Sequence, residues 1–289
     1  MPAFLDDFLW TYQSLITALG INGLLALSMY VVLAVGQLSL GQAAFMGLGA
    51  YASALMTLKL AAPLPLSLLA AVLVPAFAAL LIGVPTLRLS GVYLALATIG
   101  LGEMLRIFFV NSELTGGALG LSGIPTLSEE VGPALIFGSL ALALMALTFV
   151  CRSRLGRAME AIREDEVAAG VLGIDLPTYK LTALVASAML AGLAGAFDAH
   201  VTSFIGPGAY GFDAAVTILS FALLGGIGSP FGPVAGAFVL TLMPELLRPL
   251  HDFRLVFNGL IIVLVVLFMP RGVLVWRIGR MAAGPVKPP

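Results

Sequence analysis

The sequence predicts an all-α protein, a polytopic helix bundle that crosses a membrane about eight to ten times. Of its 289 residues, 60% are hydrophobic and only 10% are charged, and the mean hydropathy is +1.09. Ordinary soluble domains carry about 25% charged residues. A soluble globule is therefore excluded, and we interpret residues 1–289 as a single transmembrane domain.

Nine apolar stretches are candidate spans, because about 20 apolar helical residues are needed to cross a hydrocarbon core. They are 13–35, 42–60, 65–84, 91–110, 133–151, 180–200, 213–228, 231–247 and 255–269. The fifth and the ninth are the most uniformly apolar. The seventh and eighth are divided by the stretch GGIGSPFGP, so a partly re-entrant hairpin is an alternative to two full crossings.

The basic residues indicate the orientation, since cytoplasmic loops retain Lys and Arg. The loop after the fifth span, CRSRLGRAMEAIREDE, is rich in arginine, and the carboxyl-terminal tail is basic as well. We place both inside, which agrees with the even number of spans between them. This orientation puts the acidic amino terminus outside and the carboxyl terminus in the cytoplasm.

Several classes of chemistry are excluded. No Lys follows a Gly, so the phosphate-binding sequence GxxxxGK[ST] is absent and any ATP and magnesium must be bound by another chain. An HExxH metal pair and a GxSxG nucleophile turn are also missing. A net charge of −1 gives no reason to expect nucleic acid as a partner. We therefore expect a non-enzymatic protein with no cofactor or metal of its own.

Two glycine-rich stretches interrupt the apolar sequence. The first, GQLSLGQAAFMGLGAY at 36–51, contains Gln37, Ser39 and Gln42, and the second, GGIGSPFGPVAG at 225–236, contains Ser229. Broken helices at membrane depth free backbone groups that can meet a polar solute, and paired breaks are a pointer to a substrate site. The four side chains are candidates for the substrate pathway. Tight turns between helix hairpins are the alternative interpretation.

Other polar groups in the spans have a structural interpretation. Glu103 and Arg106 are three residues apart and share a helix face, so we predict an ion pair near the outer end of the fourth span. Asp198 and His200 are interpreted as solvated loop residues. Small residues spaced four apart in the span 180–200, including Gly192 and Gly195, predict close helix packing.

The most informative polar segment is 152–180, RSRLGRAMEAIREDEVAAGVLGIDLPTYK. Leu155, Met159 and Ile162 recur at helical spacing, which predicts a short amphipathic helix that ends before Gly173 and Pro177. Such a helix can lie on the membrane surface or dock into the groove of a partner. The pattern alone leaves both alternatives open.

This segment resembles the cytoplasmic coupling loop of bacterial ABC importer permeases, and in particular those for branched-chain amino acids, whose subunits are called LivM and LivH. The matching stretches are GQLSLGQAAFMGLGAYASAL, the block from Arg152 to Ala196, LLGGIGSPFGPVAGA and LFMPRGVL. They cover most of the chain in the expected order. The long basic-to-acidic block and the MPRGVL ending are more similar to LivM.

The resemblance implies a coupling loop at 152–179 that packs into an ATPase subunit. The residues that it assigns to this contact are Arg157, Glu160, Ala161, Arg163, Glu166, Ala168, Ala169 and Gly173. It further implies a multi-pass protein of the bacterial inner membrane, with two ATP-binding subunits, a second homologous permease subunit and a periplasmic solute-binding protein as partners. The expected function is translocation of branched-chain amino acids by alternating access. Urea or short amides are alternative cargoes, and an ATP-independent secondary transporter is the rival mechanism.

Overall fold

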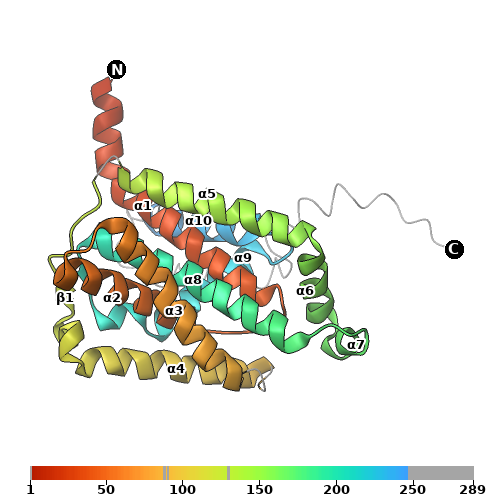
Figure 1. Ribbon diagram of the computed structural model, residues 1–289. Coiled ribbons are helices and arrows are strands. Elements are labelled where there is room, and N and C mark those ends of the chain that lie inside the picture. The colour runs from red at the N-terminus through yellow and green to blue at the C-terminus, as the bar shows by residue number, and fades with distance from the viewer. Residues whose placement is uncertain (1, 87–88, 90, 129–130, 247–289) are drawn as a thin grey trace.

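The computed structural model describes residues 2–86, 89, 91–128 and 131–246 of the chain. Within these residues, the long helices run side by side, antiparallel for the most part (Figure 1). The membrane-length helices are α1 (Pro2–Leu33), α2 (Gln42–Leu60), α3 (Leu64–Thr86), α4 (Gly91–Asn111), α5 (Val131–Arg152) and α8 (Leu176–Thr202). Shorter helices are α6 (Arg154–Glu164), α7 (Glu166–Val171), α9 (Phe212–Gly225) and α10 (Phe231–Leu246). The predicted all-α bundle is confirmed in this part of the chain.

The two ends of the bundle are built differently. At one end, which we call the α7 end, α6 and α7 project from the bundle between α5 and α8 (Figure 1). At the opposite end, the sheet end, β1 (Leu121–Ser122) pairs antiparallel with β2 (Phe204–Ile205). The 3₁₀ helices η1 (Glu113–Thr115), η2 (Gly117–Leu119) and η3 (Pro207–Tyr210) flank the two strands in the sequence. The α4–α5 and α8–α9 connections therefore meet at the sheet end.

Six helices are long and apolar enough to cross a membrane among the residues that the structure describes. They correspond to the first six predicted spans. Helices α9 and α10 are apolar but shorter, with 14 and 16 residues, below the approximately 20 residues of a full crossing. The ninth predicted span, 255–269, lies outside the described residues. The predicted count of nine spans is therefore not confirmed.

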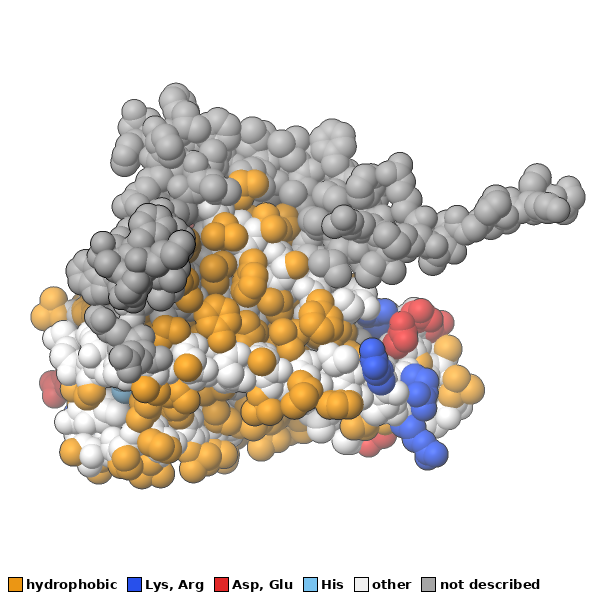
Figure 2. Space-filling view, turned by 90° about the horizontal axis from the view of Figure 1, so that it is seen from above, with side chains coloured by type: hydrophobic (Ala, Val, Ile, Leu, Met, Phe, Trp, Pro, Cys, Tyr) orange, Lys and Arg blue, Asp and Glu red, His pale blue; other side chains and the backbone are white. Residues whose placement is uncertain are grey.

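The outer surface matches a lipid environment over most of its area. Large apolar side chains of α3 and α5 are exposed, for example Phe77, Leu81 and Phe149. Figure 2 shows hydrophobic side chains across the visible face, with acidic and basic side chains gathered at the α7 end. Charged groups concentrate where water is expected, and the membrane-facing helices are almost free of them on this face.

Helix α8 lies at the centre of the bundle and packs against α1, α2 and α3. A Cβ atom built on Gly49 of α2 would lie 2.2 Å from the carbonyl oxygen of Gly192, and one built on Gly195 would lie 2.0 Å from that of Met46. Such distances require the two backbones to touch. The prediction that Gly192 and Gly195 serve close helix packing is confirmed.

The first glycine-rich stretch contains a real break. Residues 37–41 have no regular secondary structure, and helix α2 begins at Gln42. The amide of Leu40 donates to Thr98 Oγ1 of α4 at 2.9 Å, and Gln42 donates to Ser187 Oγ of α8 at 3.3 Å. Because both partners lie within long helices and away from their ends, the chain re-enters the bundle here, and α2 begins inside it.

The second glycine-rich stretch is a tight helix hairpin. Residues 226–230 connect α9 to α10, and a Cβ atom built on Gly225 would lie 1.8 Å from the carbonyl oxygen of Gly232. Gly226 has φ +83°, in the region that favours glycine. The glycines of 225–236 therefore allow two short helices to pack backbone to backbone, as the turn interpretation expects.

The prediction that Asp198 and His200 are solvated loop residues was wrong, because both lie within α8 and Asp198 is half-buried. His200 lies in the last turn of α8 and is buried. Its Nδ1 is 2.8 Å from the carbonyl oxygen of Pro125, and its Nε2 is 2.9 Å from Ser53 Oγ. Since a carbonyl oxygen only accepts, Nδ1 donates to Pro125, and the other ring nitrogen is paired with the serine hydroxyl. The ring joins α2, α8 and the 123–128 loop at the sheet end.

Candidate translocation and coupling sites

Two consecutive helices, α6 and α7, occupy the predicted coupling loop, where the sequence predicts one amphipathic helix. Ser153 caps the start of α6 by accepting from the amide of Leu155 at 3.1 Å. Asp165 breaks the helix with an extended backbone, and its Oδ1 accepts from the amides of Val167 and Ala168 at 2.9 and 3.0 Å. An N-cap aspartate at this position stabilises a new helix start. The loop is therefore an angled pair of short helices.

Arg163 connects α6 to both glycine-rich stretches. Its Nη1 donates to the carbonyl oxygen of Ile227 in the α9–α10 turn at 3.4 Å, and its Nη2 lies 3.5 Å from Glu160. A Cβ atom built on Gly36, at the end of α1, would lie 3.2 Å from the Arg163 Cα atom. The two breaks thus approach the same residue of α6, so a shift of this helix would disturb its contacts with both breaks.

Helix α7 is attached to α8 by an ion pair. Glu166 Oε1 accepts from Lys180 Nζ, and the lysine side chain is only 7% exposed. Ala169 is buried in a small apolar cluster with Ile162, Val31 and other side chains of α1 and α8. Glu166 and Ala169 therefore hold the loop in place against the bundle, and their side chains are engaged within this chain.

The outward surface of α7 is apolar. Val167, Val171 and Leu172 are 78%, 84% and 79% exposed. Helix α7 lies at the end of the molecule opposite β1 (Figure 1), which is the end where the charged side chains gather (Figure 2). These three residues were not among the predicted site residues, although the four-residue spacing of Val167 and Val171 on a short helix could have pointed to them. An exposed apolar cluster beyond the membrane-length helices marks an interaction surface.

The remaining residues assigned to the coupling contact are spread over the loop. Arg157 and Glu160 on α6, Ala168 on α7 and Gly173 after it are exposed, and Ala161 is half-buried. Gly173 has φ +84° and ends α7 together with Leu172. These exposed members and the apolar side chains of Val167, Val171 and Leu172 all belong to the loop between α5 and α8.

The candidate pathway residues of the first break are enclosed by the bundle. Ser39 and Gln42 are each 1% exposed, and Gln37 is also buried. Ser187 Oγ lies 3.0 Å from Ser28 Oγ and accepts from Gln42, so a polar cluster joins α1, α2 and α8. Ser39 Oγ accepts from the amide of Gly41 at 3.2 Å. These contacts hold the extended segment inside the membrane-length helices.

Two amide oxygens of this segment have no hydrogen-bond donor. Within the described part of the chain, Gln37 Oε1 and Gln42 Oε1 are buried and unpaired. Leaving a buried acceptor unpaired costs about 1–3 kcal/mol. A solute that brings its own donors would satisfy them. Ser229 lies elsewhere: it is a half-buried residue of the α9–α10 turn, whose carbonyl accepts from the Gly232 amide at 3.1 Å.

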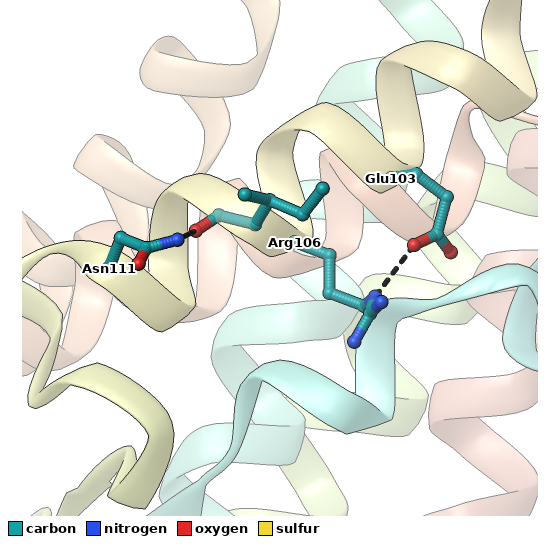
Figure 3. A network of polar contacts seen from close by, with 4 residues as sticks. Glu103, Arg106 and Asn111 are labelled. Atoms are coloured by element: carbon teal, nitrogen blue, oxygen red, sulfur yellow. Dashed lines mark hydrogen bonds and ion pairs between the residues drawn. The ribbon is translucent and has the colours of Figure 1, made fainter.

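The predicted ion pair of α4 is confirmed. Arg106 Nε donates to Glu103 Oε2 at 2.7 Å, and the side chains are 39% and 37% exposed. Figure 3 shows both side chains leaving the same face of α4 and reaching toward each other. The predicted position near the helix end is only partly right, because Glu103 is two residues from Leu101, the midpoint of Gly91–Asn111. A charged pair is thus partly exposed near the middle of a membrane-length helix.

These features define a multi-pass membrane transport protein: apolar helices surround a re-entrant polar segment, and a polar loop at one end contacts it. In the described part of the chain no group of three His, Cys, Asp or Glu side chains could hold a metal ion. Comparison with known proteins gives the family. Residues 11–269 match the family profile described as branched-chain amino acid transport system / permease component. The chain belongs to this family.

The individual relatives agree with this assignment. The chain is 35% identical to the high-affinity branched-chain amino acid transport system permease protein LivM of Salmonella typhimurium, over 90% of this chain and 67% of that protein. It is 34% identical to LivM of Escherichia coli over the same shares. The LivH protein of Escherichia coli is 35% identical over 46% of this chain and 44% of its own length. No solved structure matches the chain. The predicted likeness to LivM is confirmed.

Proposed function

We propose that the chain is a membrane-spanning permease subunit of an ATP-binding cassette importer. In this role it moves branched-chain amino acids across the bacterial inner membrane by alternating access and performs no bond chemistry itself. Two ATP-binding subunits, which hold ATP and magnesium, a second homologous permease and a periplasmic solute-binding protein complete the transporter. The α7 end and the carboxyl terminus then face the cytoplasm. Branched-chain amino acids are proposed as the cargo because the LivM relatives are branched-chain amino acid permeases.

The observation that carries the proposal is the α6–α7 loop. It projects from the bundle with three exposed apolar side chains, two on α7 and Leu172 directly after it, and it is anchored to α8 through Glu166 and Lys180. A membrane-surface helix would have its apolar face turned to the bilayer, parallel to the membrane plane. A short projecting helix with an apolar tip instead fits a groove of a partner protein.

The contacts of Arg163 with Gly36 and Ile227 could transmit a movement of this loop to the interior of the bundle. When the ATPases close, α6 would move against the α1 end and the α9–α10 turn. The segment 37–41 follows Gly36 directly, so its polar side chains would change their surroundings. The side chains of Gln37, Ser39 and Gln42 are buried, and this supports a path that opens only when the helices around it move.

The test is ATP-dependent uptake in vesicles that contain the chain, its partner permease, the ATPases and the binding protein. We expect labelled leucine to accumulate only with ATP. ATP-dependent uptake of urea alone would mean that the chain belongs to an importer of urea and not of leucine. Leucine uptake without ATP would favour the secondary transporter and refute the proposal.

The loop itself is tested by copurification. The double substitution Val171→Asp and Leu172→Asp places two charges on the apolar surface of α7 and should abolish copurification of the ATPases. Leu119→Asp is the matched control, because Leu119 is 87% exposed at the sheet end. If the α7 variant retains the ATPases as well as the control does, this surface is not the docking site.

A further inference from the structure

The Glu103–Arg106 pair of α4 is exposed where charged side chains are most costly. Glu103 lies eight residues before Asn111 and Arg106 five residues before it, which places them about 12 and 8 Å below that helix end at 1.5 Å per residue. A charged side chain at the centre of a helix in the bilayer costs about 2.5–3.5 kcal/mol on insertion scales. Pairing reduces this cost, but more than a third of each side chain is uncovered in the described structure. Such groups face a water-filled path or protein, not hydrocarbon.

The pair has unused hydrogen-bonding groups on both its cation and its anion. Arg106 donates to Glu103 through Nε, and among the described residues no group accepts from its two terminal amino groups. A guanidinium binds a carboxylate with two parallel hydrogen bonds. The carboxylate of Glu103 has several acceptor positions and uses one for Arg106. The side chains leave the same face of α4 (Figure 3), and a Cβ atom built on Gly211 would lie 3.5 Å from Arg106 Cδ and 3.7 Å from Glu103 Oε1.

The surroundings of the pair are apolar and connect to the re-entrant segment. A small cavity of about 10 Å³ beside Glu103 is lined by Leu40, Ala43, Ile99 and Phe212, among others. Ile107, one helical turn beyond Glu103, is 54% exposed. The cavity has room for about one water molecule, so a solute would lie over the pair on its uncovered side.

We propose that Glu103 and Arg106 bind the charged head group of the transported α-amino acid. The α-ammonium group would take Glu103, the α-carboxylate would take the terminal nitrogens of Arg106, and an aliphatic side chain would lie on the apolar surface of Ile107 and Phe212. This inference rests on the proposed function and adds a choice of cargo: a zwitterion meets both charges of the pair, while urea, which carries neither charge, does not.

The experiment compares three variants in the complete transporter with saturating liganded binding protein. They are Glu103→Gln, Arg106→Gln and the double variant that carries both substitutions. Leucine uptake per ATP hydrolysed is measured together with the ATPase stimulation by the binding protein. We expect all three to lose at least about tenfold in uptake per ATP and to keep the stimulation. Glu113→Gln, an exposed acid of η1, should behave as the unchanged chain.

The double variant separates head-group binding from simple charge neutralisation. If the pair only cancels its own charges, each single variant leaves an unpaired charge, and the double variant should recover to near the unchanged level. Such recovery, or single variants with normal uptake per ATP, would overturn the inference. The double variant leaves no unpaired charge, so it decides the question even where a single variant fails to assemble.

Failure of this inference is distinguishable from failure of the proposed function. An unmodified transporter that moves leucine without ATP would refute the importer itself. An unmodified transporter that moves urea and not leucine in an ATP-dependent way would leave the importer standing and refute the head-group site.

Discussion

Replacing Gly49 of α2 by alanine should separate the two helices at the centre of the bundle. The added Cβ atom would lie 2.2 Å from the carbonyl oxygen of Gly192, where ordinary contact begins at 3.4 Å, so α2 and α8 would have to move apart by 3.4 − 2.2 = 1.2 Å. Helix α8 has no room to retreat, because a Cβ atom on Gly192 would already lie 2.2 Å from the carbonyl oxygen of Ala71 in α3.

The expected cost follows from these contacts. Overpacking of a well-filled core costs about 1–3 kcal/mol and occasionally more, and a backbone-to-backbone clash belongs at the upper end. The better helix propensity of alanine offsets about 1 kcal/mol of this cost. A net loss of about 2 kcal/mol should lower the thermal unfolding midpoint by about 5 °C in a domain of this size.

The assay is the thermal midpoint of the purified protein in detergent, with Gly138→Ala as the matched control. Gly138 lies within α5, and a Cβ atom there meets nothing within 4 Å. The control should keep or raise the midpoint, since only helix propensity changes. Equal midpoints for Gly49→Ala and Gly138→Ala would refute the close approach of α2 and α8.

Three further predictions concern contacts between segments. Glu166→Gln leaves the buried Lys180 ammonium unpaired. Because Glu166 is 46% exposed, we expect a loss of about 1–2 kcal/mol in stability, less than for a fully buried pair, and faster proteolysis of the 152–176 loop. The further substitution Lys180→Met should restore resistance to proteolysis. His200→Phe leaves Ser53 Oγ and the Pro125 carbonyl without their partner, at about 1–3 kcal/mol each, which should appear as faster hydrogen exchange at 123–128 and a lower thermal midpoint; unchanged exchange would argue against the contact. Arg163→Ala should keep ATPase copurification while leucine uptake per ATP falls, and loss of copurification would instead make Arg163 a docking residue.

The sequence by itself determined the class of the protein and most of its membrane-length helices. Hydropathy over a window of 20 residues is a local property, so the first six predicted spans agree within a few residues with the apolar spans of the six described helices. The same holds for the polar loop and for the Glu103–Arg106 pair, because residues three apart on a helix are neighbours whatever the rest of the chain does. The spacing of the small residues in α8 likewise predicted that this helix packs closely against its neighbours.

Only the tertiary structure decided which of these pieces meet. Arg163 and Ile227 are 64 residues apart, and His200 and Ser53 are 147 apart. No local pattern relates such positions, so the sequence left His200 in a loop and could not relate the two glycine-rich stretches. The length of α9 was also a tertiary result, since the turn at 226–230 is set by the close contact of Gly225 with Gly232 in α10. Apolar length predicts that a helix can cross the membrane, while packing decides where it ends and which side chains it brings together.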